Sequence, residues 1–131
     1  MQKLIQLVLV VIVLMITGCC FDLTHVKYVP VVIEIKTPSK SVWMLTEKID
    51  VPLKSWSTTK LKPSTKWEYI GTIEQGEVYK TKDQIVTVRG SNTFEAYLVI
   101  SEEQIVGFYL PIEKGFVKIS KPIKINRDAV N

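Results

Sequence analysis

Residues 94–110 read FEAYLVISEEQIVGFYL, two largely apolar runs on either side of Glu102-Glu103. Short runs of apolar, β-branched and aromatic residues around a polar break are typical of paired strands. We therefore predict a β-hairpin, in which a two-residue loop would place Tyr97 opposite Phe108. Two glutamates are a poor sequence for the primed turn that such a loop needs, so a longer loop with a shifted register remains an alternative.

The two faces of this hairpin differ in composition. We expect the uniformly apolar face to belong to the core, and it carries Phe94, Ala96, Leu98, Ile100, Ile105 and Tyr109. The mixed face includes Tyr97 and Phe108, which would be exposed if the sheet is covered on one side only and would then offer a patch to a protein partner. A second layer could cover them instead, because large aromatic side chains are usually mostly buried.

Further strand-like runs surround the hairpin and predict an all-β domain. They are residues 29–35, 49–54, 67–73, 77–80, 84–89, 116–119 and 123–125. Short strands with frequent turns indicate a small antiparallel barrel or sandwich of about six to eight strands. We place this domain at residues 28–125, and we expect residues 126–131 to be a flexible tail.

The end of the domain has a local resemblance that bears on architecture alone. Residues 107–111 read GFYLP, and residues 116–119 read FVKI. This order resembles the end of a Src-homology-type small barrel, where a glycine-aromatic strand runs to a proline and then to an aromatic-valine strand.

The N-terminus predicts export. Residues 1–20 read MQKLIQLVLVVIVLMITGCC, in which Lys3 precedes an apolar run from Leu4 to Ile16 that is interrupted only by Gln6. The thirteen residues of this run fall within the ~7–15 of the apolar region of a secretory signal. A bilayer-spanning helix needs about 20 such residues. The run is therefore predicted to be a signal peptide.

Residues Ile16-Thr17-Gly18-Cys19 end this segment. They resemble the lipobox of bacterial lipoproteins, an aliphatic residue and two small residues before a cysteine, although leucine is commoner than Ile16 and alanine or serine commoner than Thr17. The resemblance implies that residues 1–18 are a cleaved signal peptide and that Cys19 is acylated and anchored in a membrane. Residues 19–27 would then be a lipidated tether. An uncleaved signal anchor with an unmodified Cys19 is the alternative.

Cys20 is the only other cysteine. Neighbouring cysteines bridge only through a strained ring, so we expect no disulfide to stabilise the domain. In Gram-negative members of the lipoprotein class, aspartate after the lipidated cysteine commonly retains the protein in the inner membrane. Cys20 at that position therefore favours the outer membrane if the host is Gram-negative.

Residue types for activated chemistry are scarce. His25, the only histidine, lies in the expected tether, where a general base would lack the burial and fixed neighbours that tune its pKa. A zinc site needs three or four histidine, cysteine or carboxylate ligands. Glu95 and Glu113 remain as candidates for acid–base chemistry, and surface charge is the simpler interpretation of both. We expect a protein without catalytic activity, cofactor, metal or small-molecule substrate.

A lysine-rich segment suggests one alternative role. Residues 36–66 carry seven lysines against two acidic residues. Lysines near tryptophan favour anionic lipid headgroups or acidic envelope polymer, and the candidates are Lys54, Lys60, Lys62 and Lys66 with Trp56. Lysine-rich loops also keep β-domains soluble, and nucleic acid is rarely met by an exported protein. A protein partner in the cell envelope, in an accessory, assembly, immunity or exclusion role, is therefore the leading hypothesis.

Overall fold

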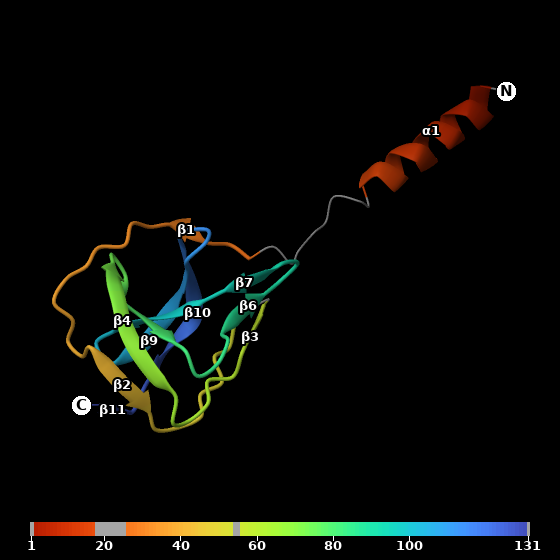
Figure 1. Ribbon diagram of the computed structural model, residues 1–131. Coiled ribbons are helices and arrows are strands. Elements are labelled where there is room, and N and C mark those ends of the chain that lie inside the picture. Colours follow the sequence, from red (N-terminus) through yellow and green to blue (C-terminus); the bar gives the residue numbers. More distant parts are fainter. Residues whose placement is uncertain (1, 18–25, 54–55, 131) are drawn as a thin grey trace.

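The computed structural model describes residues 2–17, 26–53 and 56–130 (Figure 1). Cys19, Cys20, His25 and Lys54 lie outside these ranges. None of the described helical segments has both the length and the hydropathy to cross a bilayer. The elements are α1 (Gln2–Thr17), β1 (Val29–Pro30), β2 (Val42–Leu45), β3 (Ser57–Thr58), β4 (Lys66–Ile73), β5 (Gly76–Thr81), β6 (Thr87–Arg89), β7 (Thr93–Glu95), β8 (Tyr97–Ser101), β9 (Gln104–Leu110), β10 (Gly115–Lys124) and β11 (Arg127–Ala129).

The predicted all-β class is confirmed, in a sandwich-like form. One antiparallel sheet has the order β1-β10-β9-β8-β5-β4-β2-β11, and a smaller sheet has the order β3-β6-β7. Strands β10 and β11 are nearly consecutive in the chain, yet β10 lies near one edge of the large sheet and β11 forms the other edge. The large sheet therefore curls until its two ends approach each other.

The main core lies between the two sheets. Its largest fully buried side chains include Trp43, Trp67, Tyr79 and Phe108. The Trp43 and Trp67 rings stack at 5.8 Å, and Tyr79 meets Trp43 edge-on at 5.4 Å. These contacts join β2, β4 and β5, so the aromatic side chains fix the curl of the large sheet from inside.

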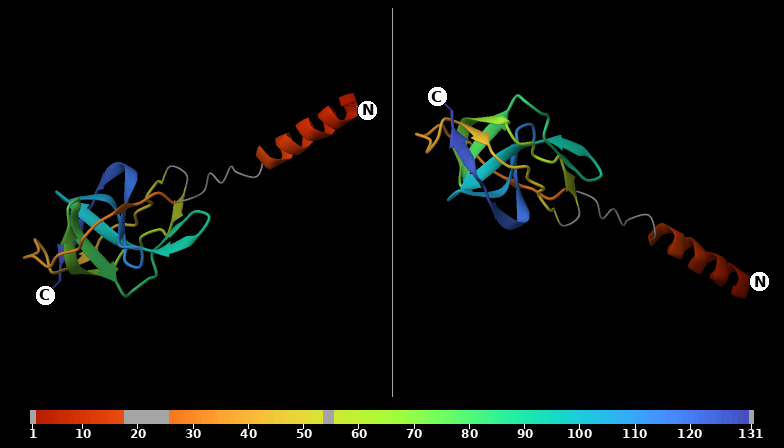
Figure 2. Two further views of the ribbon diagram at one scale, coloured as in Figure 1. Left: turned by 90° about the horizontal axis from the view of Figure 1, so that it is seen from above. Right: turned by 90° about the horizontal axis from the view of Figure 1, so that it is seen from below.

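A second apolar cluster covers the outer face of the large sheet. Residues 29–36, which we call the strap, cross this face, as the orange trace in Figure 2 shows. Strand β1 pairs with β10, and Glu34 bridges to Thr72 on β4. Between these two points Val31 and Ile33 pack onto the sheet. A Cβ at Gly71 would overlap the Ile33 side chain, so glycine is needed for this close approach.

The predicted strand at 29–35 is therefore correct only at its start. After Pro30 the strap crosses the sheet instead of pairing along it, which leaves Val32 and Ile35 78% and 87% exposed. The predicted strand at 49–54 is reduced, within the described residues, to one bridge between Ile49 and Leu61.

The C-terminal and N-terminal boundaries of the domain also differ from the prediction. Residues 127–129 are not a flexible tail but strand β11, which pairs with β2. Val26 is buried in the main core, so the domain includes residue 26, which was predicted to belong to the tether.

The two-residue loop of the β8–β9 hairpin is confirmed. Ser101 pairs with Gln104, and the loop residues Glu102 and Glu103 have φ values of 53° and 61°, as in a primed turn. A register shift beyond Ile100 then changes the pairing, so that Tyr97 lies opposite Tyr109.

The same shift corrects the predicted faces. Phe108 lies opposite Leu98 and is fully buried in the main core, while Tyr109 belongs to the outer cluster. Phe108 is therefore not an exposed contact for a partner. The bulge exchanges the sides of the two aromatic residues, because one extra residue moves the following side chains to the opposite face.

Replacing Glu102 with asparagine tests the strained turn. We expect Glu102→Asn to raise the free energy of unfolding by about 0.5–1 kcal/mol, because asparagine tolerates the left-handed conformation better than glutamate. Urea unfolding monitored by tryptophan fluorescence measures this. Glu68→Asn on β4, where asparagine is disfavoured, is the control and should give no gain. A destabilised Glu102→Asn variant would contradict the assigned turn.

Candidate functional site

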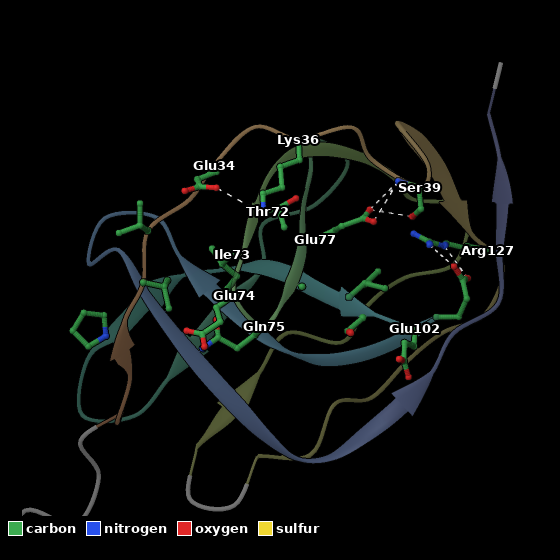
Figure 3. Close-up of a pocket in the computed structure, with 17 residues that line it drawn as sticks. Glu34, Lys36, Ser39, Thr72, Ile73, Glu74, Gln75, Glu77, Glu102 and Arg127 are labelled. Atoms are coloured by element: carbon green, nitrogen blue, oxygen red, sulfur yellow. Dashed lines mark hydrogen bonds and ion pairs between the residues drawn. The ribbon is translucent and has the colours of Figure 1, made fainter.

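A groove of about 880 Å³ opens between the strap and the ends of two hairpins (Figure 3). The strap and Ser39 form one wall. The β4–β5 turn and the β8–β9 turn contribute the others, and Arg127 of β11 completes the lining. Figure 3 shows Ser39, Glu77 and Arg127 gathered at one end, with Glu74 and Gln75 toward the other. We call this the acidic groove.

Arg127 is the best-fixed charged group of the groove. Its side chain is 2% exposed, and its guanidinium donates to both carboxylate oxygens of Glu103, at 3.0 Å from Nε to Oε2. The guanidinium carbon also lies 5.1 Å from the ring centre of Trp43 and 5.5 Å from that of Tyr79. A planar cation between aromatic faces and a bidentate carboxylate is a stable way to bury an arginine.

Glu103 shows the electrostatic effect of this arrangement. The hydrogen bonds from Arg127 hold the pKa of Glu103 below its ordinary value, and the charges of Arg127 and Lys40 act in the same direction. The Lys40 Nζ atom is 3.9 Å from Glu103 Oε2. Glu103 is thus ionised, and its charge is paired with Arg127 and Lys40 within the fold.

Glu77 of β5 links Ser39, which follows the strap, to the sheet. Its carboxylate accepts hydrogen bonds from the Tyr79 hydroxyl and from the Ser39 amide and hydroxyl, the last at 3.0 Å. Burial raises the pKa of Tyr79, and the bond to Glu77 raises it further. The hydroxyl therefore stays protonated as a donor, and this end of the groove is held rigid by polar side chains.

The remaining charges give the groove its sign. Glu34 is 3.7 Å from the Lys36 ammonium, so this pair is balanced. Glu74 and Glu102 are exposed in the two turns, and neither carboxylate forms a hydrogen bond or ion pair within the described parts of the chain. The groove consequently presents two uncompensated carboxylates on walls fixed by the Arg127 and Glu77 networks.

The predicted partner patch is not assembled as one surface. Tyr97 is half-buried on the outer face, 6.3 Å from the ring of Tyr109, and burial followed by the charge of Glu95 raises the pKa of Tyr97. Phe108, its proposed companion, lies on the other side of the sheet in the main core.

The predicted anion-binding lysines are partly brought together. Lys60, Lys62 and Lys66 are exposed in and beside the segment that leads into β4. Trp56 is half-buried against the main core. Side chains of the β5–β6 connection order this segment: Gln84 accepts from the Lys62 amide, and Asp83 accepts from the Lys66 amide at 2.6 Å.

The segment Lys60–Lys66, which we call the lysine segment, and the acidic groove lie at opposite ends of β4. Lys66 begins this strand and Ile73 ends it beside the groove, a separation of about 20 Å for eight residues. The two surfaces can therefore act independently.

No family model matches this chain, and no curated protein or solved structure is significantly similar to it. Across the described ranges, no three histidine, cysteine, aspartate or glutamate side chains are grouped so as to hold a metal ion. Arg127, Glu77 and the role of the strap in the groove were not predicted from the sequence. A single arginine near the C-terminus and a glutamate in a strand carry no local signal of a shared site.

Arg127 variants test how much the contacts of this side chain stabilise the fold. We expect Arg127→Ala to lower the free energy of unfolding by about 2–3 kcal/mol, because it removes charge-assisted hydrogen bonds and a cation–aromatic contact. Arg127→Lys should be intermediate, since lysine keeps the charge without the bidentate fork. Equal stability of all three proteins in urea unfolding would contradict this role.

The pH dependence gives an independent check. Because the pKa of Glu103 is lowered in the folded state, its contribution is present above the ordinary carboxyl value of 4.5 and is lost as the pH falls through the lowered pKa. We expect the stability difference between the wild type and Glu103→Gln to be largest at neutral pH and to vanish in acid. A difference that does not change with pH would show that the charge of Glu103 does not contribute to the free energy of unfolding.

Proposed function

We propose that this chain is a lipid-anchored, non-catalytic protein of the bacterial cell envelope whose β-domain binds a protein partner in the acidic groove. The anchor is assigned to Cys19 on the strength of its lipobox-like sequence, and the domain begins only a few residues later. This arrangement would hold the domain close to a membrane surface, in the outer membrane if the host is Gram-negative.

The acidic groove is the observation that carries the binding role. Its volume suits a short extended segment of a partner, and its walls are set by the buried Arg127 and by the hydrogen bonds of Glu77, so little ordering would be required on binding. Glu74 and Glu102 remain to pair with incoming charge. The partner segment that fits best is therefore basic, with lysine or arginine side chains directed at the two turns.

The chemistry of the groove supports binding rather than catalysis. Each of the two glutamates nearest its polar end is occupied: Glu77 accepts three protein hydrogen bonds, and Glu103 neutralises Arg127. Glu95 and Glu113, the acids considered from sequence, lie outside the groove, on β7 and in the β9–β10 turn.

Photo-crosslinking in the native envelope tests the partner-binding role. A photoreactive amino acid at position 74 should capture a defined protein, whereas the same group at position 62 should not, because that site lies at the far end of β4. Reversing both free charges with Glu74→Lys and Glu102→Lys, in a chain carrying the photoreactive group at Gln75, should abolish capture through repulsion of a basic segment.

The matched control for this charge reversal is Glu68→Lys with Glu95→Lys, which changes the net charge equally away from the groove. Capture that survives reversal at Glu74 and Glu102, or that is lost equally in the control, would contradict the acidic groove as the binding site.

A second candidate function is favoured by the ordered lysine segment. Lys62 and Lys66 are exposed and unpaired within the described chain, and Lys60 has only Asp50, at 4.0 Å, as a partner. If this segment binds an anionic envelope polymer, binding should weaken steeply between low and high salt and be lost in Lys60→Glu with Lys62→Glu. Binding of teichoic acid or lipopolysaccharide that is insensitive to both changes would exclude this function.

A further inference from the structure

A second groove, of about 570 Å³, lies where the chain enters the domain. Its apolar lining comes from Tyr28, Val29, Val106, Phe116 and Pro122. Lys27 and Lys118 also line it. It adjoins the acidic groove, because Gln75 of the β4–β5 turn contributes to both. We call it the lysine-rimmed groove.

The apolar lining is held in place by close packing on glycines. The Tyr28 ring covers Gly115, where a Cβ would overlap it, and meets Phe94 edge-on at 6.5 Å. The Phe116 ring covers Gly107 in the same way. Despite this packing around them, Tyr28 and Val29 remain 41% and 52% exposed. An exposed apolar patch that is fixed rather than collapsed indicates a surface prepared for contact.

The charged residues that line this groove, Lys27 and Lys118, are both lysines. Strand β10 contains Lys118, Lys121 and Lys124 and no acidic residue, and all three lysines are exposed. Two further exposed lysines are Lys27, which precedes β1, and Lys114, which lies in the β9–β10 turn. None of these five lysines forms an ion pair with another described residue. An apolar and tyrosine surface with exposed lysines in its lining and along the adjoining strand is complementary to an anionic lipid surface.

We propose that the lysine-rimmed groove and the exposed side of β10 lie against the anionic phospholipid surface of the membrane that holds the anchor. This inference rests on the proposed anchoring at Cys19. The eight peptide units between Cys19 and Lys27 can span at most about 28 Å, so the groove is never far from the bilayer. The tyrosine and valine would enter the headgroup region while the lysines pair with lipid phosphates.

This contact would set the orientation of the domain relative to the membrane. With β10 on the membrane, the β4–β5 turn that separates the two grooves stands beside the lipid surface, and the acidic groove opens next to it. The lysine segment at Lys60–Lys66 is a competing candidate for lipid contact, and it occupies a different part of the surface. The two surfaces can be distinguished in a single experiment, because each carries its own reactive lysines.

Amine footprinting of the full processed chain tests the inference. The protein, purified from membranes, is reconstituted into vesicles of phosphatidylcholine alone or of phosphatidylcholine with phosphatidylglycerol, and lysine acylation is read by mass spectrometry. We expect Lys27, Lys118 and Lys121 to react at least ~10-fold more slowly on the anionic vesicles than on the neutral ones, with Lys60 and Lys62 unchanged. High salt should restore their reactivity.

Charge reversal supplies the matched comparison. Lys118→Glu with Lys121→Glu should return Lys27 to full reactivity on anionic vesicles, whereas Lys60→Glu with Lys62→Glu should leave Lys27 protected. Equal reactivity on both vesicle types, or protection of Lys60 and Lys62 in place of Lys118 and Lys121, would overturn the proposed orientation.

Flotation and intact mass of the same samples separate this inference from the anchor. A chain that floats with both vesicle types and is acylated, yet shows no protection at β10, overturns the orientation alone. A chain that floats with neither overturns the anchoring and the orientation together.

Discussion

A buried arginine joins parts of the domain that are far apart in the sequence. Arg127 lies on the last strand, over aromatic rings of β2 and β5, and binds a carboxylate in the β8–β9 turn. Burying a cation is costly unless its charge and its donors are matched. Trp43, Tyr79 and Glu103 supply most of that match, so the curled sheet is most stable when its C-terminal edge strand is docked.

The same constraint helps to build the acidic groove. Docking of β11 brings the β8–β9 turn and Arg127 to one end of the sheet, while the strap crosses the outer face above it. The strap is held on the sheet by the β1 pairing, by the bridge at Glu34 and by the packing of Val31 and Ile33, and both grooves open beside it. One opening is acidic and the other is apolar with a lysine rim. The surface proposed for a basic partner and the surface proposed for anionic lipid thus adjoin at the β4–β5 turn.

The sequence predicted what depends on local pattern. The hairpin around Glu102-Glu103 and the all-β class follow from the alternation of residues, and both are confirmed. The bulge beyond Ile100 has no such signal, since Val106 and Gly107 suit either register. Phe108 is buried because this bulge turns its side chain toward the main core. Strand β11 and the path of the strap differ from the prediction for a similar reason: their conformations depend on contacts with residues far away in the chain. The acidic groove, which these long-range contacts assemble, could not be read from the sequence.

The docking of the C-terminal strand is the central claim, and backbone dynamics test it most directly. Within β11 and just beyond it, Val130 donates its amide to the Val42 carbonyl, and Arg127–Ala129 pair with Trp43–Leu45. Nuclear magnetic relaxation of the amide groups of residues 127–130 should give order parameters near about 0.85, similar to those of the core strands. Values below about 0.6 would show a free tail and would contradict the account.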